Sequence, residues 1–284
     1  MRTTAGGSSR IAEAVLGAVL PELRTRHGAS RMPAAAPVVI PATPSATVEV
    51  AGDEIDDEAH GPLMRALTAA DETTWRSLAT DVLCSPPIGD RAALRRRWLV
   101  PMARRLGTAW SEDAASFTDV TIGMGRLKWI MDAAPGVPRD GAGPRVLLTP
   151  TPGDGHVFGL DLLAEELREG GFAVEVHRRP TTAGIARAVS RRPIAVLGIG
   201  VSVTRHAGRA AALVRAARRA AGAVGRDVPL VIAGGSAARH SQALLQSVGV
   251  DAILDGSEAP SSWLVRRLGE RGDAQGLESA PRMA

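Results

Sequence analysis

Residues 145–159, RVLLTPTPGDGHVFG, contain the grouping with the clearest chemistry: Asp154, His156 and Gly159, spaced as D-x-H-x-x-G. The mostly apolar run 145–149 predicts a buried strand, and the Pro, Gly and Asp residues after it predict a loop. A carboxylate two residues before a histidine can bind one ring nitrogen, which leaves the other nitrogen free and more basic. That pairing suits a metal ligand. Because one protein ligand is too few to hold a bare ion, we expect the metal to arrive inside an organic cofactor.

Strand-like and helical segments alternate after the Gly/Pro-rich linker 135–144, which predicts a parallel sheet covered by helices on both faces. Ligands of such sheets bind beyond the carboxyl ends of the strands. The expected strands are 146–149, 173–176, 194–198, 230–233 and 252–254, and the expected helices begin near Val157, Thr181, Gly208, Ala237 and Pro260.

Two further loops at the same edge of the predicted sheet have suitable residues. Ser202, Val203 and Thr204 follow the third strand and offer two hydroxyls for hydrogen bonding. Gly234 and Gly235 follow the fourth strand and leave room for a ligand along the sheet edge. Each motif is weak alone, but the three together, each after the proper strand, predict one binding site.

Residues 61–135 precede the sheet and show four segments of helical periodicity with short connections, which predict a four-helix bundle. Asp71 and Asp90 are expected to cap the second and third helices, and Pro101 to bend the third. The fourth helix has apolar residues at positions 117, 120, 124, 127 and 131. The predicted organisation is an N-terminal helix and flexible tether (1–60), the bundle (61–135), the sheet domain (144–272) and a tail (273–284).

The composition limits the other classes of function. Of the 284 residues one is cysteine, Cys84, which excludes a disulfide framework and a cysteine-rich metal site, and we expect its thiol to be at least partly buried. We find no export signal and no apolar run long enough for a membrane span, so a cytoplasmic protein is expected. The net charge is +4, and over the whole chain arginines are interspersed with acids. This pattern argues against direct binding of nucleic acid.

The three loop motifs resemble those of cobalamin (vitamin B12) binding domains. This resemblance covers about residues 61–271 and implies that His156 is the lower cobalt ligand and Asp154 its hydrogen-bonding partner. It further implies that the bundle caps the corrin ring and that the bound form is adenosyl-, methyl- or hydroxocobalamin. The implied cofactor contacts of the loops are Gly155, Val157, Gly159, Ser202, Val203, Thr204, Gly234 and Gly235.

Residues of the predicted bundle indicate which family of cobalamin-binding proteins the chain resembles most. Methyl-carrying corrinoid proteins and CarH-type photoreceptors have a Trp followed after nine residues by Glu-His, whereas here Trp110 is followed by Val120 and Thr121. The run WSEDAASFTDVTIGMGRLKWIM is similar to the AerR/PpaA family. That similarity implies a light-responsive antirepressor that binds a transcriptional repressor of the CrtJ/PpsR type and is not an enzyme.

Several alternatives stay open at this level. A corrinoid methyl carrier would have the same lower site, and a receiver or another flavodoxin-like binder is disfavoured because the first loop has Asp154 as its only acid. Trp110, Val120 and Thr121 could be bundle core or cofactor contacts. His206 is expected to be exposed, and His60 is a possible second cobalt ligand.

Overall fold

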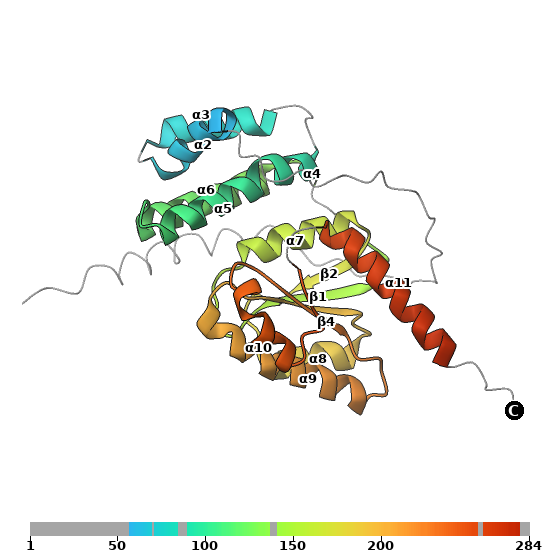
Figure 1. The fold of residues 1–284 in the computed structure, drawn as a ribbon. Coiled ribbons are helices and arrows are strands. Elements are labelled where there is room, and N and C mark those ends of the chain that lie inside the picture. The colour runs from blue at the N-terminus through green and yellow to red at the C-terminus, as the bar shows by residue number, and fades with distance from the viewer. Residues whose placement is uncertain (1–56, 70, 85–89, 137–140, 255–257, 279–284) are drawn as a thin grey trace, which may run out of the picture. The chain divides into compact units, whose positions relative to one another are not determined.

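The computed structural model describes residues 57–69, 71–84, 90–136, 141–254 and 258–278. The first part of this range is helical (Figure 1), and we call helices α2 to α6 the bundle. The predicted N-terminal helix and most of the tether lie outside the described residues. The bundle comprises α2 (Asp57–Thr68), α3 (Glu72–Cys84), α4 (Arg91–Leu94), the π-helical turn η1 (Arg95–Leu99), α5 (Val100–Ser111) and α6 (Phe117–Ala133).

The caps predicted from the sequence are present. Asp71 accepts hydrogen bonds from the backbone N–H groups of Thr73 and Thr74, and Asp90 accepts one from Ala93 at 3.0 Å. These bonds satisfy donors that the first turn of a helix leaves free. The third predicted helix is one continuous segment, α4–η1–α5, in which the expected irregularity near Pro101 takes the form of the π-helical turn just before it.

The bundle has its own apolar core, to which each helix contributes. Gly123 of α6 is buried against α5, where an added Cβ atom would lie 2.9 Å from Leu106. A larger residue at this position would require the buried Leu106 side chain to shift. The larger buried side chains of this core include Leu63, Leu67, Trp75, Leu99, Met102, Leu106, Leu127 and Ile130.

The rest of the chain forms a five-stranded parallel sheet, as predicted, with strand order β2-β1-β3-β4-β5. The strands are β1 (Arg145–Pro150), β2 (Ala173–Val176), β3 (Val196–Gly200), β4 (Leu230–Gly234) and β5 (Ala252–Ile253). β3 begins two residues later than expected, because pairing with β1 starts at Val146 opposite Val196. This strand order is the flavodoxin-like one, with its switch point between β1 and β3.

Helices cover both faces of the sheet, and alternating strand residues point to each layer. Val146 and Leu148 pack with α7 (Phe158–Glu169) and α11 (Pro260–Glu278), while Leu147 packs with the opposite layer. That layer contains α8 (Thr182–Arg191), α9 (Ala210–Ala223) and α10 (Gln242–Ser247), with the 3-10 turns η2 (Thr204–Arg209) and η3 (Arg239–Ser241). No described helix is long and apolar enough to cross a membrane.

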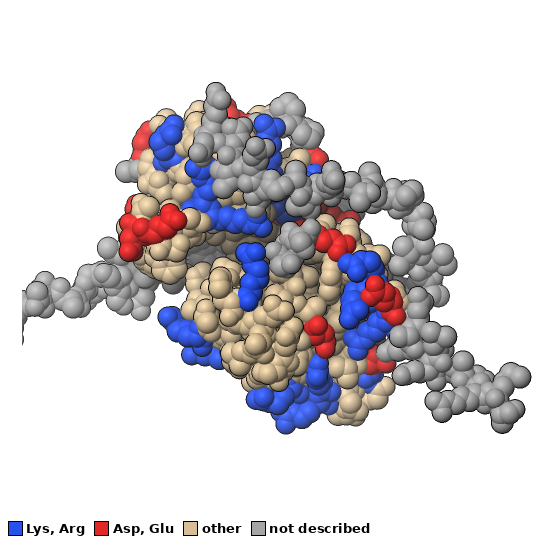
Figure 2. Space-filling view, in the orientation of Figure 1, with Lys and Arg blue, Asp and Glu red and all other residues tan. Residues whose placement is uncertain are grey.

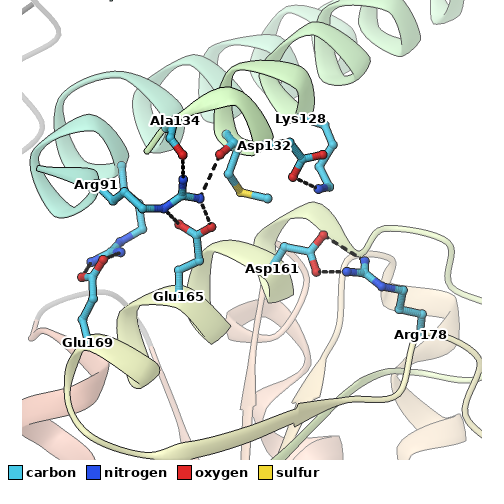
Figure 3. Close-up of polar contacts among 10 residues, drawn as sticks. Arg91, Lys128, Asp132, Ala134, Asp161, Glu165, Glu169 and Arg178 are labelled. Atoms are coloured by element: carbon cyan, nitrogen blue, oxygen red, sulfur yellow. Dashed lines mark hydrogen bonds and ion pairs between the residues drawn. The ribbon is translucent and has the colours of Figure 1, made fainter. Parts of the chain in front are cut away.

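Helix α7 lies between the sheet and the bundle. Its residues Leu160 and Leu167 pack on the sheet, whereas Leu162 belongs to the bundle core. Its carboxylates also bind the bundle: Glu165 pairs with Arg91, and Glu169 accepts two hydrogen bonds from Arg95. Figure 3 shows these ion pairs side by side. The helix that follows the histidine loop is therefore held on two sides.

Candidate functional site

The three loops singled out in the sequence leave neighbouring points of the sheet. Pro150 at the end of β1 is in register with Gly200 of β3, and Gly200 is in register with Gly234 of β4. Because the strands are parallel, the segments after these residues emerge at one edge, at the switch point between β1 and β3. The prediction that the three motifs share an edge is confirmed.

Asp154 holds His156 through both its ring and its backbone. The Asp154 Oδ1 atom lies 2.6 Å from Nδ1 of His156 and accepts a hydrogen bond from the backbone N–H of His156 at 3.0 Å. The Asp154 side chain is 1% exposed, whereas the His156 side chain is 58% exposed. Nε2 of the ring forms no hydrogen bond with any residue that the structure describes. The imidazole is thus fixed at one nitrogen and open at the other.

Asp154 also joins two of the loops. Its Oδ2 atom accepts a hydrogen bond from the backbone N–H of Ser202 at 3.0 Å. Burial by itself raises the pKa of Asp154, but the hydrogen bonds from His156 and Ser202 outweigh it and leave the pKa below its ordinary value. The side chain is therefore a carboxylate at neutral pH. As an acceptor it favours the tautomer with hydrogen on Nδ1, which leaves the lone pair on Nε2.

Glycines keep space open around this imidazole. An added Cβ atom at Gly155 or Gly159 would meet nothing within 4 Å among the atoms of the chain. Val157 lies between them, half-buried, at the N-cap of α7. A ring nitrogen without a hydrogen-bond partner in the described part of the chain, in a loop whose glycines leave space, fits a bulky, planar group that brings its own metal. Among the described residues, no cluster of three or more His, Cys, Asp or Glu side chains could hold a bare ion.

The double glycine after β4 has one position with a strict backbone requirement. Gly235 has φ +109°, and a Cβ atom there would lie 2.7 Å from the carbonyl oxygen of Val201. Gly234 has only ordinary contacts, with Leu254. The close approach of the β3 and β4 loops therefore depends on Gly235.

The hydroxyls of the β3 loop are placed differently from one another. Ser202 is half-buried and bound to Asp154 through its backbone, while its carbonyl oxygen accepts a hydrogen bond from the Ser236 hydroxyl at 3.1 Å. Val203 is half-buried, and the exposed Thr204 begins η2. Both side-chain hydroxyls are free of hydrogen bonds to the described residues and can face a ligand.

Two features of the histidine loop were not predicted from the sequence. Arg209, at the end of η2, donates a hydrogen bond from Nη1 to the carbonyl oxygen of Pro152 at 2.9 Å and lies against Gly153, whose φ is +81°. The Oγ1 atom of Thr151 is buried without a hydrogen-bond partner. Since Arg209 is more than fifty residues from the loop, no local sequence signal indicates its role.

The expected cofactor contacts of the bundle lie near the turn between α5 and α6. Trp110 is 49% exposed, so its alternative as ordinary bundle core is wrong, and contact with a cofactor stays a prediction. Phe117, expected in the buried stripe of α6, is 75% exposed. Val120 is half-buried, and the exposed Thr121 donates its hydroxyl hydrogen to the carbonyl oxygen of Phe117.

Three other sequence expectations are corrected by burial. His206, expected to be exposed, is a buried residue of η2, and Cys84, expected to be at least partly buried, is exposed. His60, the possible second cobalt ligand, is buried with Nε2 2.8 Å from the carbonyl oxygen of Arg97 and its ring edge-on to Trp98. That position within the bundle does not suit a ligand role.

Comparisons with known proteins agree with this fold. No family model matches the sequence. An uncharacterized 20.5 kDa protein in the bchF-crtJ intergenic region of Rhodobacter capsulatus is 33% identical over 105 residues. The match covers 34% of this chain and 55% of that protein, so the chain spans about half the length of this curated relative.

Among solved structures, the monomethylamine corrinoid protein of Methanosarcina barkeri aligns with 75% of this chain and 97% of its own, at TM-score 0.59 and 13% identity. A cobalamin-binding protein from Desulfitobacterium hafniense also aligns with 75% of this chain and 97% of its own, at 15% identity and TM-score 0.39. The first alignment defines the class of fold: a helical region followed by the Rossmann-like, five-stranded sheet domain of corrinoid proteins.

Proposed function

We propose that this chain is a cobalamin-binding regulator in which His156 would hold the cobalt of the cofactor. The observation that carries the proposal is the Asp154–His156 pair, which leaves the Nε2 atom of an exposed imidazole free to bind a metal, in a loop with open space at Gly155 and Gly159. The corrinoid-protein fold supports it, because this edge of the sheet is where ligands of that architecture bind.

The other loop residues have distinct roles in this proposal. The carboxylate of Asp154 fixes the tautomer of His156 and, through Ser202, holds the β1 and β3 loops together. The hydroxyls of Ser202 and Thr204 would hydrogen-bond polar groups of the cofactor's nucleotide tail, and Gly234 and Gly235 would leave room for it. When bound, an alkylcobalamin supplies a cobalt–carbon bond that light can break.

The regulatory part of the proposal concerns the bundle. Trp110, with Val120 and Thr121, would contact the bound cofactor, and a change in the group that they contact would alter the surface that the bundle offers to a partner. About 5.5 kcal/mol of differential affinity would move a two-state equilibrium from 1:99 to 99:1. The position of the relative's gene between bchF and crtJ supports a link to a CrtJ/PpsR-type repressor as the partner. In this proposal the chain acts on that repressor as an antirepressor and is not an enzyme.

A methyl-carrying corrinoid protein is the second candidate, favoured by the alignment with the monomethylamine corrinoid protein. Its lower site would use the same His156. We rank it second because Val120 and Thr121 provide no acid or imidazole in the bundle at the positions where Glu-His is expected. Methyl transfer from a methylated cobalamin-loaded sample to an acceptor methyltransferase would favour the carrier.

The lower site is tested with His156→Ala, using His240→Ala as the matched control because His240 is exposed and outside the histidine loop. We expect His156→Ala to lose at least tenfold in cobalamin affinity and to lose the visible spectrum of imidazole-ligated cobalt, while the control keeps both. Unchanged colour and affinity in His156→Ala would remove the proposed function. The regulatory part is tested by measuring repressor binding in dark and illuminated samples, where equal affinity would remove the light switch alone.

A further inference from the structure

The layer of helices α8 and α9 has an unusual distribution of charge. Residues 176–250, which include both helices, contain a single acidic residue, Asp227, although the chain has 30 Asp and Glu residues. The same segment has arginines at positions 178, 179, 187, 191, 192, 205, 209, 215, 218, 219, 226 and 239. Over the whole chain, acidic residues lie among the arginines. In this layer, apart from Asp227, they do not.

Four of these arginines form one outward face, which we call the α8–α9 arginine face. Arg187 and Arg191 are one turn apart on α8, Arg215 and Arg219 are one turn apart on α9, and all four are exposed. The two helices pack against each other through a shared apolar core. Figure 2 shows Lys and Arg atoms along the base of the view, where Figure 1 places α8 and α9.

None of these four arginines forms an ion pair with a described residue. Exposed arginines elsewhere in the chain do: Arg76 pairs with Glu72, Arg266 with Glu258, and Arg267 with Glu270. The chain uses arginine in preference to lysine everywhere, but in α3 and α11 the arginines have acidic partners. The preference for arginine therefore does not explain why the arginines of this face have none among the described residues. Like charges one turn apart oppose helix formation, so the arrangement does not serve stability.

The remaining surface of this face indicates the kind of partner. None of the exposed large apolar side chains of the described residues lies in α8 or α9. Membrane-surface helices and the cores of protein interfaces use large apolar and aromatic residues. In this layer the exposed Val224 follows α9 and the exposed Leu244 lies on α10, but none of the exposed aromatic side chains of the described residues belongs to it. The exposed positions near the arginines are small, including Ala183 and Gly222, which allows a rigid polyanion to approach closely.

We infer that the α8–α9 arginine face binds the phosphate backbone of duplex DNA. Guanidinium groups suit phosphate oxygens because their planar forks donate two parallel hydrogen bonds. This layer packs on the opposite face of the sheet from α7, which follows the histidine loop. DNA binding of this kind depends on charge, carries no base specificity, and does not require the cobalamin site.

The test uses the full chain and a fluorescein-labelled 30-base-pair duplex of arbitrary sequence, with fluorescence anisotropy measured from about 50 to 200 mM KCl. The variant replaces all four residues: Arg187→Gln, Arg191→Gln, Arg215→Gln and Arg219→Gln. The matched control removes the same charge from exposed or half-exposed arginines outside the face: Arg76→Gln, Arg266→Gln, Arg267→Gln and Arg271→Gln. Visible absorption of cobalamin-loaded samples and thermal melting check that both variants keep the site and the fold.

Because each neutralised phosphate contributes about 0.9 to the slope of log affinity against log salt, we expect the face variant to lower that slope by about 3 to 4. We expect it to weaken binding at 50 mM KCl by at least about tenfold, with about threefold or less in the control. The inference fails if the wild-type chain does not bind the duplex at micromolar concentrations, or if both variants lose affinity equally. Tighter binding to phosphatidylserine vesicles than to the duplex would also overturn it. Failure here leaves the cobalamin spectrum, and so the proposed function, unaffected.

Discussion

At the scale of single residues, the site depends on backbone positions as much as on the imidazole. Asp154 organises the histidine loop with one carboxylate that accepts from a ring nitrogen and from two backbone N–H groups. Gly235 allows the β4 loop to approach the β3 loop at Val201. Gly159, by contrast, has no packing reason to be glycine, since an added Cβ would meet no atom of the chain. The fold therefore leaves room for a larger side chain at this position.

The two glycines should separate folding from binding. Gly235→Ala places a Cβ against the carbonyl of Val201 at positive φ, so we expect it to lower the free energy of unfolding by about 1–3 kcal/mol. Gly159→Ala should leave stability unchanged or raise it by up to about 1 kcal/mol, because alanine favours helix α7, yet it should weaken cobalamin binding. Urea denaturation and cobalamin titration measure both quantities. If Gly159→Ala binds cobalamin normally, the space beside α7 is not a cofactor contact.

At the scale of elements, α7 is the link between the histidine loop and the bundle. Its sheet-facing residues are apolar. On its other side, the carboxylates of Glu165 and Glu169 bind Arg91 of α4 and Arg95 of η1. Arg91 is the more deeply engaged, because it also donates to the backbone carbonyls of Ala134 and Met131 at the end of α6. Figure 3 shows that this one guanidinium joins three helical segments. A change in the bundle can therefore reach α7 directly.

Removing this cation should cost much more than removing an exposed one. Arg91→Met leaves the Glu165 carboxylate and two carbonyls buried without their partner, and we expect a loss of about 3–5 kcal/mol in the free energy of unfolding. The control is Lys128→Met, which breaks the exposed pair with Asp132 and should cost about 0.5 kcal/mol or less. Chemical denaturation compares the two. Similar small losses in both would show that the Arg91 cluster does not hold the bundle to α7.

At the scale of the whole molecule, α7 packs against the bundle on one side and against the sheet on the other (Figure 1). The candidate site lies at the edge of the sheet where the paired strands β1 and β3 end. A cofactor that contacts both the sheet loops and the bundle would bind the folded state alone. Its binding energy then adds to the stability of the folded chain.

We therefore expect cobalamin to raise the melting temperature of the full chain. At a free concentration about 100 times its Kd, a ligand specific for the folded state adds about 2.7 kcal/mol, or roughly 5–10 °C for a domain of this size. His156→Ala should abolish most of the shift, whereas the four-residue variant of the α8–α9 arginine face should keep it. Differential scanning calorimetry in the dark makes the comparison. An equal shift in His156→Ala would mean that cobalamin binds without this ligand.

The sequence by itself determined the features that depend on local pattern. Alternating apolar runs predicted the five strands within two residues, and the N-cap residues Asp71 and Asp90 predicted two helix starts. The D-x-H-x-x-G spacing predicted the Asp154–His156 pair, because two residues in one loop can meet without help from the rest of the chain.

Only the tertiary structure decided which side chains are buried and which distant residues meet. Arg91 and Glu165 are 74 residues apart, and Arg209 reaches a loop 57 residues away, so neither contact has a local signal. Burial of His206 and exposure of Cys84 and Trp110 likewise depend on packing between elements. The α8–α9 arginine face depends on both. The sequence shows the excess of arginine over acid in this segment, and the packing of α8 against α9 brings the arginines of the two helices onto one surface.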